Sequence, residues 1–267
     1  MEKSELLALF DRQMRIETQF PGVLQETVGN VVRSISPNER FGFISYSNLP
    51  DETANAQIDA QVAFYRDLNM RFEWKVYDHD RPADLRERLR QRGFSVDDPE
   101  ALMILDLEHA PEFYWTMKLP HIDHITEPEG LEGIICMEDE VWGTDHAWMR
   151  DLQGKDLVEH PHLLSVYAVP ADGRVVSAAW MYYHPPSQFA SLWGGSTLPA
   201  YRKRGFYTAL LAVRAREARR RGIRYLTIDA SPMSRPILEK HGFQFLEFST
   251  PCVWDPAKLE VQGGQSA

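Results

Sequence analysis

Apolar residues recur along the chain with two spacings, one typical of helices and the other of strands. In the first hundred or so residues, helical spacing predicts helices at 3–16, 52–69 and 82–93. Runs of β-branched, aromatic or alternating residues predict strands at 28–36, 40–48, 71–78 and 100–108. The first half of the chain therefore combines both kinds of element.

The apolar pattern is interrupted at residues 109–130, which carry three prolines and little periodicity. We therefore place a domain boundary near Leu119. Beyond it the spacing predicts strands at 121–126, 163–169, 174–183, 189–197 and 224–229, helices at 128–142, 145–159, 206–221 and 235–241, and an extended stretch at 243–254. The expected organisation is a domain at 1–118, a second at 119–257 and a flexible tail at 258–267.

The two halves share an order of elements. Residues 85–94, LRERLRQRGF, match residues 234–243, SRPILEKHGF: each is a short helix that ends at Gly and is followed by Phe at the start of a strand. A helix ending in Gly is common by itself. The matched order of the elements around both segments favours an internal duplication.

Composition and charge narrow the class of protein. Hydrophobic residues make up 43% and charged residues 25% of the 267 residues, which is typical of a soluble globular protein. The sequence shows neither a signal-peptide pattern nor a membrane span, and Cys136 and Cys252 have no metal-ligand spacing. We expect a cytoplasmic protein that binds no metal and no membrane.

The net charge of −10 argues against a nucleic-acid partner, because phosphate neutralisation provides most of that affinity. The charge is uneven, however: residues 202–224 are strongly basic, whereas 127–145 are acidic. A local basic patch on an acidic protein suits a small polyanion better than a duplex.

The most informative segment is STLPAYRKRGFYTALL at residues 196–211, where a strand leads through a short loop into an amphipathic helix. The first turn of a helix has unpaired N–H groups, and its dipole favours negative charge. Gly205 allows the backbone to approach a ligand closely, and Arg202, Lys203 and Arg204 add positive charge. These features together predict a pyrophosphate site.

Here the chain resembles the GNAT acyltransferase superfamily. The signature of that family is Arg/Gln-x-x-Gly-x-Gly/Ala at the start of a helix, and Arg202 and Gly205 match it in RKRGFY. Tyr207 replaces the last small residue, which is a departure. The downstream segment 224–243, with its EKHGF ending, is also similar to the family. The resemblance implies an α+β fold of two GNAT-like domains, each a mixed, mostly antiparallel sheet flanked by helices.

The resemblance also implies where acetyl-CoA binds as a co-substrate. Backbone amides of the loop and first helical turn would hold the pyrophosphate, and the strand before the loop would bind pantetheine. Ser231, at the end of the next strand, aligns with an Asn that many members have. The implied cofactor-binding residues are Ser196, Thr197, Leu198, Arg202, Lys203, Arg204, Gly205, Phe206, Tyr207, Thr208 and Ser231.

The catalytic side chains of the family carry over less completely. Many members have a Tyr acid where this chain has Leu238, which cannot donate a proton. Ser231, Ser234 or Tyr207 is then the candidate acid. In some members a Glu of the strand at 189–197 is the base, but this strand has no Glu here. His184 and Asp229 are then the candidates for the base. Positioning of the amine beside the thioester supplies much of the rate in any case.

The first half is expected to lack the same site. Its corresponding turn, SYSNLPDETANAQ at 45–57, has no Gly and no basic residue, and it carries Asp51 and Glu52. Negative charge there would repel a pyrophosphate. We interpret the first half as a degenerate copy that forms one wall of the acceptor cleft.

The sequence thus predicts an N-acetyltransferase in which an amine attacks the thioester of acetyl-CoA directly. The acceptor is a small molecule or a peptide, and the protein is a monomer or a homodimer. Two alternatives stay open at this point. One is a non-catalytic CoA-binding sensor or regulatory module, which the missing Tyr at Leu238 favours; the other is a tandem-GNAT aminoacyl transferase, which the compact RKRG loop disfavours.

Overall fold

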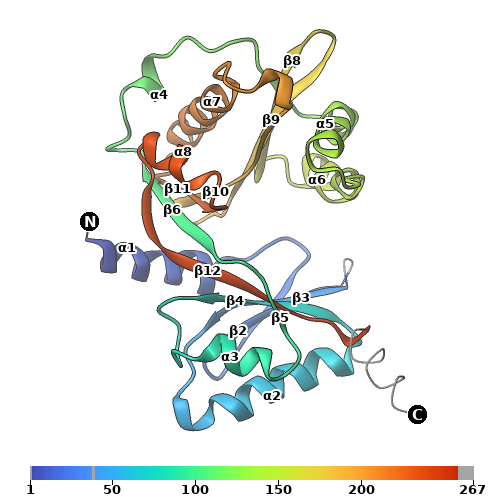
Figure 1. Ribbon diagram of the computed structural model, residues 1–267, viewed down its shortest axis with the longest axis vertical. Coiled ribbons are helices and arrows are strands. Elements are labelled where there is room, and N and C mark those ends of the chain that lie inside the picture. Colours follow the sequence, from blue (N-terminus) through green and yellow to red (C-terminus); the bar gives the residue numbers. More distant parts are fainter. Residues whose placement is uncertain (1, 38–39, 258–267) are drawn as a thin grey trace. The chain divides into compact units, whose positions relative to one another are not determined.

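The computed structural model describes residues 2–37 and 40–257, which form two compact units (Figure 1). The first unit contains the chain up to Leu102, residues 229–235 and the residues from Phe245 onward, and the second contains Met103–Ile228 and Pro236–Gln244. The chain therefore passes between the units at several points of the sequence and not once near Leu119. The tail expected at 258–267 lies outside the described residues.

The first unit is a mixed sheet with helices packed against it. β1, β2 and β3 are antiparallel, β3 and β4 are parallel, and β12 from the end of the chain pairs antiparallel with β4 and β5. The elements of this half of the chain are α1 (Lys3–Phe10), η1 (Asp11–Ile16), β1 (Leu24–Val28), β2 (Val31–Ser36), β3 (Phe41–Ser47), α2 (Asp51–Asp67), β4 (Arg71–Tyr77), α3 (Leu85–Arg90), β5 (Ser95–Val96) and β6 (Glu100–Asp106).

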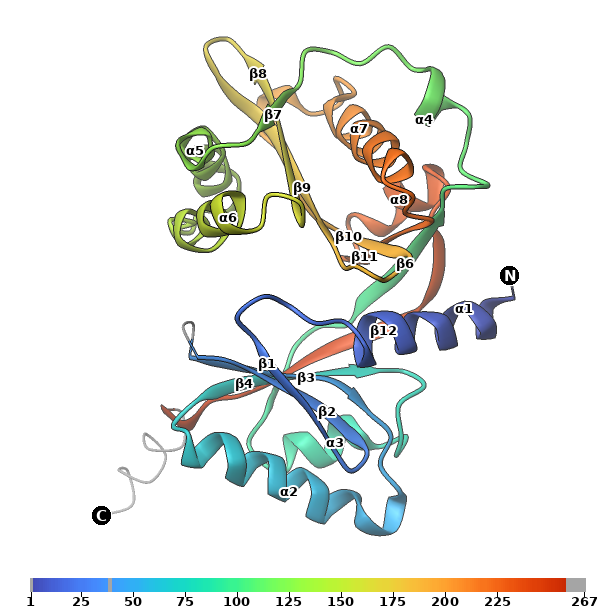
Figure 2. The same ribbon diagram turned by 180° about the vertical axis from the view of Figure 1, so that it is seen from behind.

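The second unit has the same kind of sheet. β7, β8, β9 and β10 are antiparallel, β10 and β11 are parallel, and α5 and α6 cover one face while α7 covers the other (Figure 2). The elements of the second half of the chain are α4 (Phe113–Thr116), β7 (Asp123–Ile125), η2 (Pro128–Leu131), α5 (Glu132–Trp142), α6 (Trp148–Glu159), β8 (Leu164–Ala171), β9 (Arg174–Tyr183), β10 (Phe189–Thr197), η3 (Pro199–Tyr201), α7 (Phe206–Arg220), β11 (Tyr225–Ala230), α8 (Arg235–Lys240) and β12 (Gln244–Trp254).

The predicted fold class is confirmed, and most elements fall where the spacing places them. β9 and β10 have the predicted bounds. The strand predicted at 28–36 is wrong in one respect: Gly29, with φ of +60°, turns the chain there, so the segment is a hairpin of β1 and β2. β1 was not predicted because its sequence, LQETV, is mostly exposed and polar and has no apolar face.

Each unit contains a strand, a crossover helix and a parallel strand, followed by a short helix that ends in the same way. Gly93 and Gly242 have φ of +86° and +89°. After each glycine the Phe N–H donates back into the helix, from Phe94 to the oxygen of Leu89 (3.3 Å) and from Phe243 to that of Leu238 (3.1 Å). The two matched segments of the sequence therefore form the same helix-ending turn.

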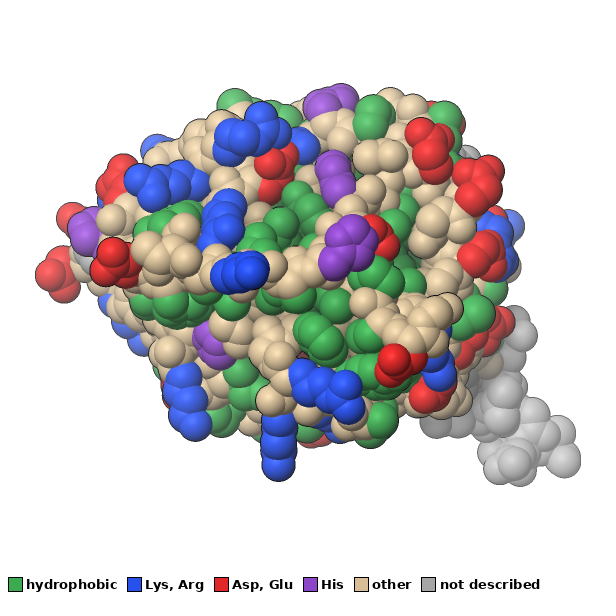
Figure 3. Space-filling model, turned by 90° about the horizontal axis from the view of Figure 1, so that it is seen from above, with side chains coloured by type: hydrophobic (Ala, Val, Ile, Leu, Met, Phe, Trp, Pro, Cys, Tyr) green, Lys and Arg blue, Asp and Glu red, His purple; other side chains and the backbone are tan. Residues whose placement is uncertain are grey.

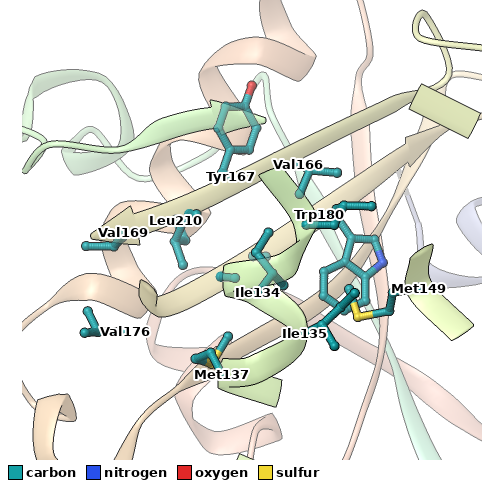
Figure 4. Packing of buried hydrophobic residues seen from close by; sticks show 14 of the residues in the cluster. Ile134, Ile135, Met137, Met149, Val166, Tyr167, Val169, Val176, Trp180 and Leu210 are labelled. Atoms are coloured by element: carbon teal, nitrogen blue, oxygen red, sulfur yellow. The ribbon is translucent and has the colours of Figure 1, made fainter. Parts of the chain in front are cut away.

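The core of the second unit lies between α5, α6 and the sheet (Figure 4). Ile134 and Met137 on α5 are fully buried against Val166 and Val176 of the sheet, with Trp180 beside them. Burying a side chain of this size contributes about 1.5–3 kcal/mol. In the described part of the chain, no helix is long and apolar enough to cross a membrane.

The first unit contains a buried ion network that joins η1 to the turn after β4. Arg15 donates from Nη2 to both oxygens of Asp80 (2.9 and 2.8 Å) and from Nη1 to Asp11 (2.7 Å). His79 contacts Asp11 through Nε2 (2.7 Å) and Glu247 through Nδ1 (2.5 Å). Its hydrogen bonds to these two carboxylates raise the pKa of His79 to about 10.

This network predicts a pH-dependent stability. Because the folded pKa of His79 lies above its ordinary 6.5, its contribution is fully present below pH 6.5 and is lost as pH rises through about 10. His79→Gln should cost about 1–2 kcal/mol at pH 6, a value that allows for screening of the partly exposed ring. Urea unfolding at several pH values measures it; a difference between wild type and variant that grows from pH 6.5 to pH 10 would contradict the assignment.

Candidate functional site

The predicted loop lies where β10 ends and α7 begins. Gly205 precedes the helix with φ of +84°, and a Cβ added to it would meet nothing within 4 Å, so the backbone faces open space. The first helical hydrogen bond runs from the N–H of Ala209 to the oxygen of Gly205 (2.9 Å). The N–H groups of Phe206, Tyr207 and Thr208 thus have no acceptor inside the helix, and no described side chain caps it. This arrangement can bind an anion.

The loop cations are exposed and carry no counter-charge. Arg202 donates from Nε to the oxygen of Thr197 (3.1 Å), and Arg204 donates to that of Ala200 (3.2 Å). Among the residues that the structure describes, no carboxylate is paired with Arg202, Lys203 or Arg204. The Arg202 bond holds the loop to the end of β10, the Arg204 bond lies within the loop, and both leave the positive charge available to a ligand.

The other basic residues of α7 have structural partners. Arg216 donates to the oxygens of Tyr114 (2.6 Å) and Met117 (2.7 Å), and Arg220 and Arg221 pair with Glu217. The basic stretch expected to assist a phosphate is thus largely used within the second unit. One face of the molecule shows Lys and Arg side chains grouped around exposed hydrophobic ones (Figure 3).

β10 separates from β11 before it reaches the loop. The two strands pair at Phe189–Ser191 and Tyr225–Thr227, whereas β10 continues to Thr197. Beyond the paired residues, the edge of β10 toward β11 has backbone groups without a strand partner in the described chain. A diverging pair of this kind offers hydrogen bonds to the amide groups of an extended ligand.

A β-bulge accompanies this separation. Trp193 pairs with Trp180, Gly194 with Ala179 and Ser196 with Ala178, so Gly195 is the extra residue. Added Cβ atoms would lie 2.4 Å from the Trp180 ring at Gly194 and 2.9 Å from the Tyr207 ring at Gly195. Only glycine at both positions allows the bulge to form against those rings.

Gly195 explains how the chain accommodates Tyr207 where the family signature has a small residue. The ring of Tyr207 occupies the space beside Gly195 and meets the His241 ring edge to face, with centroids 6.3 Å apart. Burial raises the pKa of Tyr207, so its hydroxyl stays protonated at neutral pH. The bulky residue is therefore accommodated by the sheet and does not block the loop.

The candidate serines precede α8. Ser231 and Ser234 belong to residues 229–235 of the first unit, whereas the loop belongs to the second. Their hydroxyls are 3.1 Å apart, and the oxygen of Ser231 accepts hydrogen bonds from the N–H groups of Ser234 (3.1 Å) and Arg235 (3.0 Å). They form the turn that leads into α8. Leu238 is fully buried, as a core residue would be.

The two substitutes for a base have other partners. His184 is buried and its Nε2 contacts Ser191 Oγ (2.8 Å), and burial lowers its pKa to about 4. Asp229 accepts a hydrogen bond from Ser249 (3.0 Å) and pairs with Lys75 (3.3 Å) in the first unit. Both arrangements are those of structural residues.

Glu138 on α5 is a further acid that the sequence did not single out. Its Oε2 accepts hydrogen bonds from Ser196 Oγ (2.7 Å) and Trp142 Nε1 (2.8 Å), which places it beside the predicted pantetheine strand. The residue is 2% exposed. A signal was available: Glu138 follows Ile134 by four positions and therefore lies on the apolar face of its helix.

The corresponding turn of the first unit differs in charge. α2 begins at Asp51, whose carboxylate pairs with Arg88. The turn borders an open hollow of about 550 Å³ lined by residues 48–51 and 81–83. Its lining includes one acid, Asp51, and one base, Arg81.

One group of described residues has metal-ligand spacing. Ligand atoms of Asp106, Glu108 and His109 lie within 4.8 Å of one another. Arg224 pairs with Asp106 (3.2 Å) and Glu108 (3.0 Å) and supplies their positive partner.

Comparisons with known proteins give a family match and structures of the same fold. Residues 128–243, from η2 to the end of the α8 turn, match the model of the acetyltransferase (GNAT) family. No curated protein matches the sequence. Among solved structures, the chain is similar to a GCN5-related N-acetyltransferase from Kribbella flavida (12% identity, 95% of this chain and 94% of that one, TM-score 0.66).

Two further structures share the fold. One is a GCN5-related N-acetyltransferase from Sphaerobacter thermophilus (14% identity, 84% and 76% coverage, TM-score 0.57). The other is a tandem GNAT protein from the clavulanic acid biosynthesis pathway (11% identity, 90% and 85% coverage, TM-score 0.58). At these identities the likeness establishes the fold.

The bulge predicts a specific stability effect. Gly195→Ala combines a left-handed backbone with a contact of 2.9 Å to Tyr207, whereas Gly173→Ala, with φ of +76° and open space, has the strain alone. We expect Gly173→Ala to cost about 1–2 kcal/mol and Gly195→Ala about 1–3 kcal/mol more. Urea unfolding measures both. Tyr207→Ala should remove most of the excess, and equal costs for the two glycine variants would refute the close contact.

Proposed function

We propose that residues 128–243, which match the model of the acetyltransferase (GNAT) family, form an acetyltransferase domain, and that the protein transfers the acetyl group of acetyl-CoA to an amine. The observation that supports this most directly is the uncapped start of α7 behind Gly205, with three unpaired cations around it. A pyrophosphate fits this site because backbone N–H groups, the helix dipole and the loop charges all favour an anion.

The proposed binding mode uses one continuous path along β10 and α7. The amides of Phe206, Tyr207 and Thr208 hold the pyrophosphate, and the edge of β10 beyond its pairing with β11 hydrogen-bonds to the pantetheine arm at Ser196–Leu198. The N–H of Leu198 donates to the oxygen of Val176 (2.9 Å) and the oxygen of Ser196 accepts from Ser177 Oγ (2.7 Å), so the other backbone groups of this segment are the ones offered to the arm. The thioester then lies near the bulge.

The chemistry supplied by the co-substrate is an activated acyl carbon with a thiolate leaving group. The chain positions the acceptor amine beside it and donates hydrogen bonds to the developing oxyanion from the backbone of β10. Tyr207, which is protonated at neutral pH and belongs to the same unit as the loop, is the preferred proton donor for the thiolate. Ser231 and Ser234 remain alternatives for that role.

The proposal predicts the effect of charge at the loop. Gly205→Glu places a carboxylate where the pyrophosphate binds and should weaken acetyl-CoA affinity at least a hundredfold, because like charges repel in a confined site. Isothermal calorimetry measures the affinity. Gly222→Glu is the matched control: this glycine, at the other end of α7, is also exposed, has φ of +78° and has open space around it.

The control variant should bind acetyl-CoA as the wild type does. Equal affinity of all three proteins would refute the site at Gly205. Binding of acetyl-CoA without turnover on any amine would instead favour a non-catalytic sensor.

A further inference from the structure

Only one of the two oxygens of the Glu138 carboxylate has hydrogen-bond partners. Its Oε2 accepts two hydrogen bonds, from Ser196 and Trp142, whereas Oε1 is buried and has no hydrogen-bond partner among the described residues. Leaving a buried carboxylate oxygen unpaired is costly, and native structures rarely do so without a reason. The site is therefore incomplete as the chain alone builds it.

The bulge in β10 brings Ser196 to this carboxylate. Residues directly opposite in an antiparallel pair lie on the same face of the sheet, and Ser196 is paired with Ala178. Ala178 and Trp180 both belong to the core that α5 covers, so the extra residue Gly195 turns Ser196 toward α5. As a result, Glu138 is one hydrogen bond away from the strand that the proposed function assigns to pantetheine.

The surroundings of Glu138 contain no cation that neutralises it. Burial is the main cause that raises its pKa; His146, after the end of α5, opposes this rise, and Asp139 adds to it. Asp139 is itself in contact with His146, at 3.0 Å from Nδ1. The residues that β9 packs against α5, Val176, Ala178 and Trp180, are uncharged. Apart from His146, the groups that act on Glu138 supply no positive charge, so an ammonium ligand would complete its pairing.

Trp142 suits the same kind of ligand. Its indole N–H is fixed on Glu138, yet 59% of the residue is exposed. A ring held at one edge and open to solvent offers its face to a cation or to a flat ring. A carboxylate and an aromatic face together recognise an organic ammonium group.

We propose that Glu138 is the base of the reaction and that its Oε1 binds the ammonium group of a cationic primary amine acceptor. This inference rests on the proposed acetyl transfer. The carboxylate removes one proton from the ammonium, and the freed nitrogen lone pair forms a bond to the thioester carbon. The nitrogen then gives up its second proton, the carbon–sulfur bond breaks, the sulfur leaves with the electron pair and takes up a proton, and Glu138 returns its own proton to solvent.

The test compares Glu138→Gln with Glu140→Gln. The glutamine keeps an oxygen to accept hydrogen bonds from Ser196 and Trp142, but it cannot take a proton. Glu140 lies on the same helix, is exposed and pairs with Arg174, so its variant controls for loss of an acid from α5. Acetyl-CoA affinity is measured by calorimetry, and thiol release is measured with putrescine, glucosamine, tryptamine and a peptide with a free N-terminus.

We expect Glu138→Gln to lower kcat/KM by about 10²–10⁴ for every amine that reacts, while acetyl-CoA affinity stays within twofold. The wild-type rate should rise with pH through a pKa above that of an ordinary Glu. The pH profile of the variant should lack this rise. Glu140→Gln should behave as the wild type in both measurements.

Urea unfolding distinguishes a catalytic role of Glu138 from a structural one. Removal of an unpaired buried charge should leave the urea midpoint of Glu138→Gln equal to or higher than that of the wild type, whereas a structural acid would lower it. Turnover by Glu138→Gln at the wild-type rate, an unchanged pH profile, or a wild type that binds acetyl-CoA and acetylates none of the amines would each overturn the inference. Failure of the wild type to bind acetyl-CoA would instead refute the proposed function.

Discussion

The bulge at Gly194 and Gly195 is the constraint on which the rest of the second unit depends. One extra residue in β10 breaks the regular alternation of side chains. The strand then separates from β11, its backbone edge becomes available, and its last residues lead to the start of α7. The separated edge, the loop and the position of Ser196 therefore follow from a single irregularity.

The bulge is held from both faces of the sheet by buried charged residues. From α7, Arg214 donates from Nη1 to the oxygens of Trp180 (3.1 Å) and Trp193 (3.3 Å), on the two strands that flank the bulge. From α5, Glu138 accepts the hydroxyl of Ser196. Burial lowers the pKa of Arg214 to about 10, so the guanidinium is still charged at neutral pH. Arg214 satisfies carbonyl groups that the distorted ladder leaves unpaired, whereas Glu138 keeps one oxygen for a ligand.

The two units show how the same order of elements supports different sites. In both, a helix begins after a strand and leads to a parallel neighbour. α7 follows a bulged strand and begins at an exposed glycine with free cations, whereas α2 follows Pro50 and begins with Asp51. The two helix starts thus differ in local charge and backbone conformation, and not in topology.

The sequence by itself determined the elements, the fold class and the place of the loop, because helical and strand spacing and the Arg202–Gly205 signature are local properties of the chain. The division into units was not predictable from one break in periodicity, since β12 joins strands that are distant in sequence. Glu138 and Ser196 are 58 positions apart in the sequence. Their hydrogen bond depends on a bulge that no local sequence pattern predicts. Only the tertiary structure decided it, because burial and pairing of a polar group depend on neighbours that the chain brings together by folding.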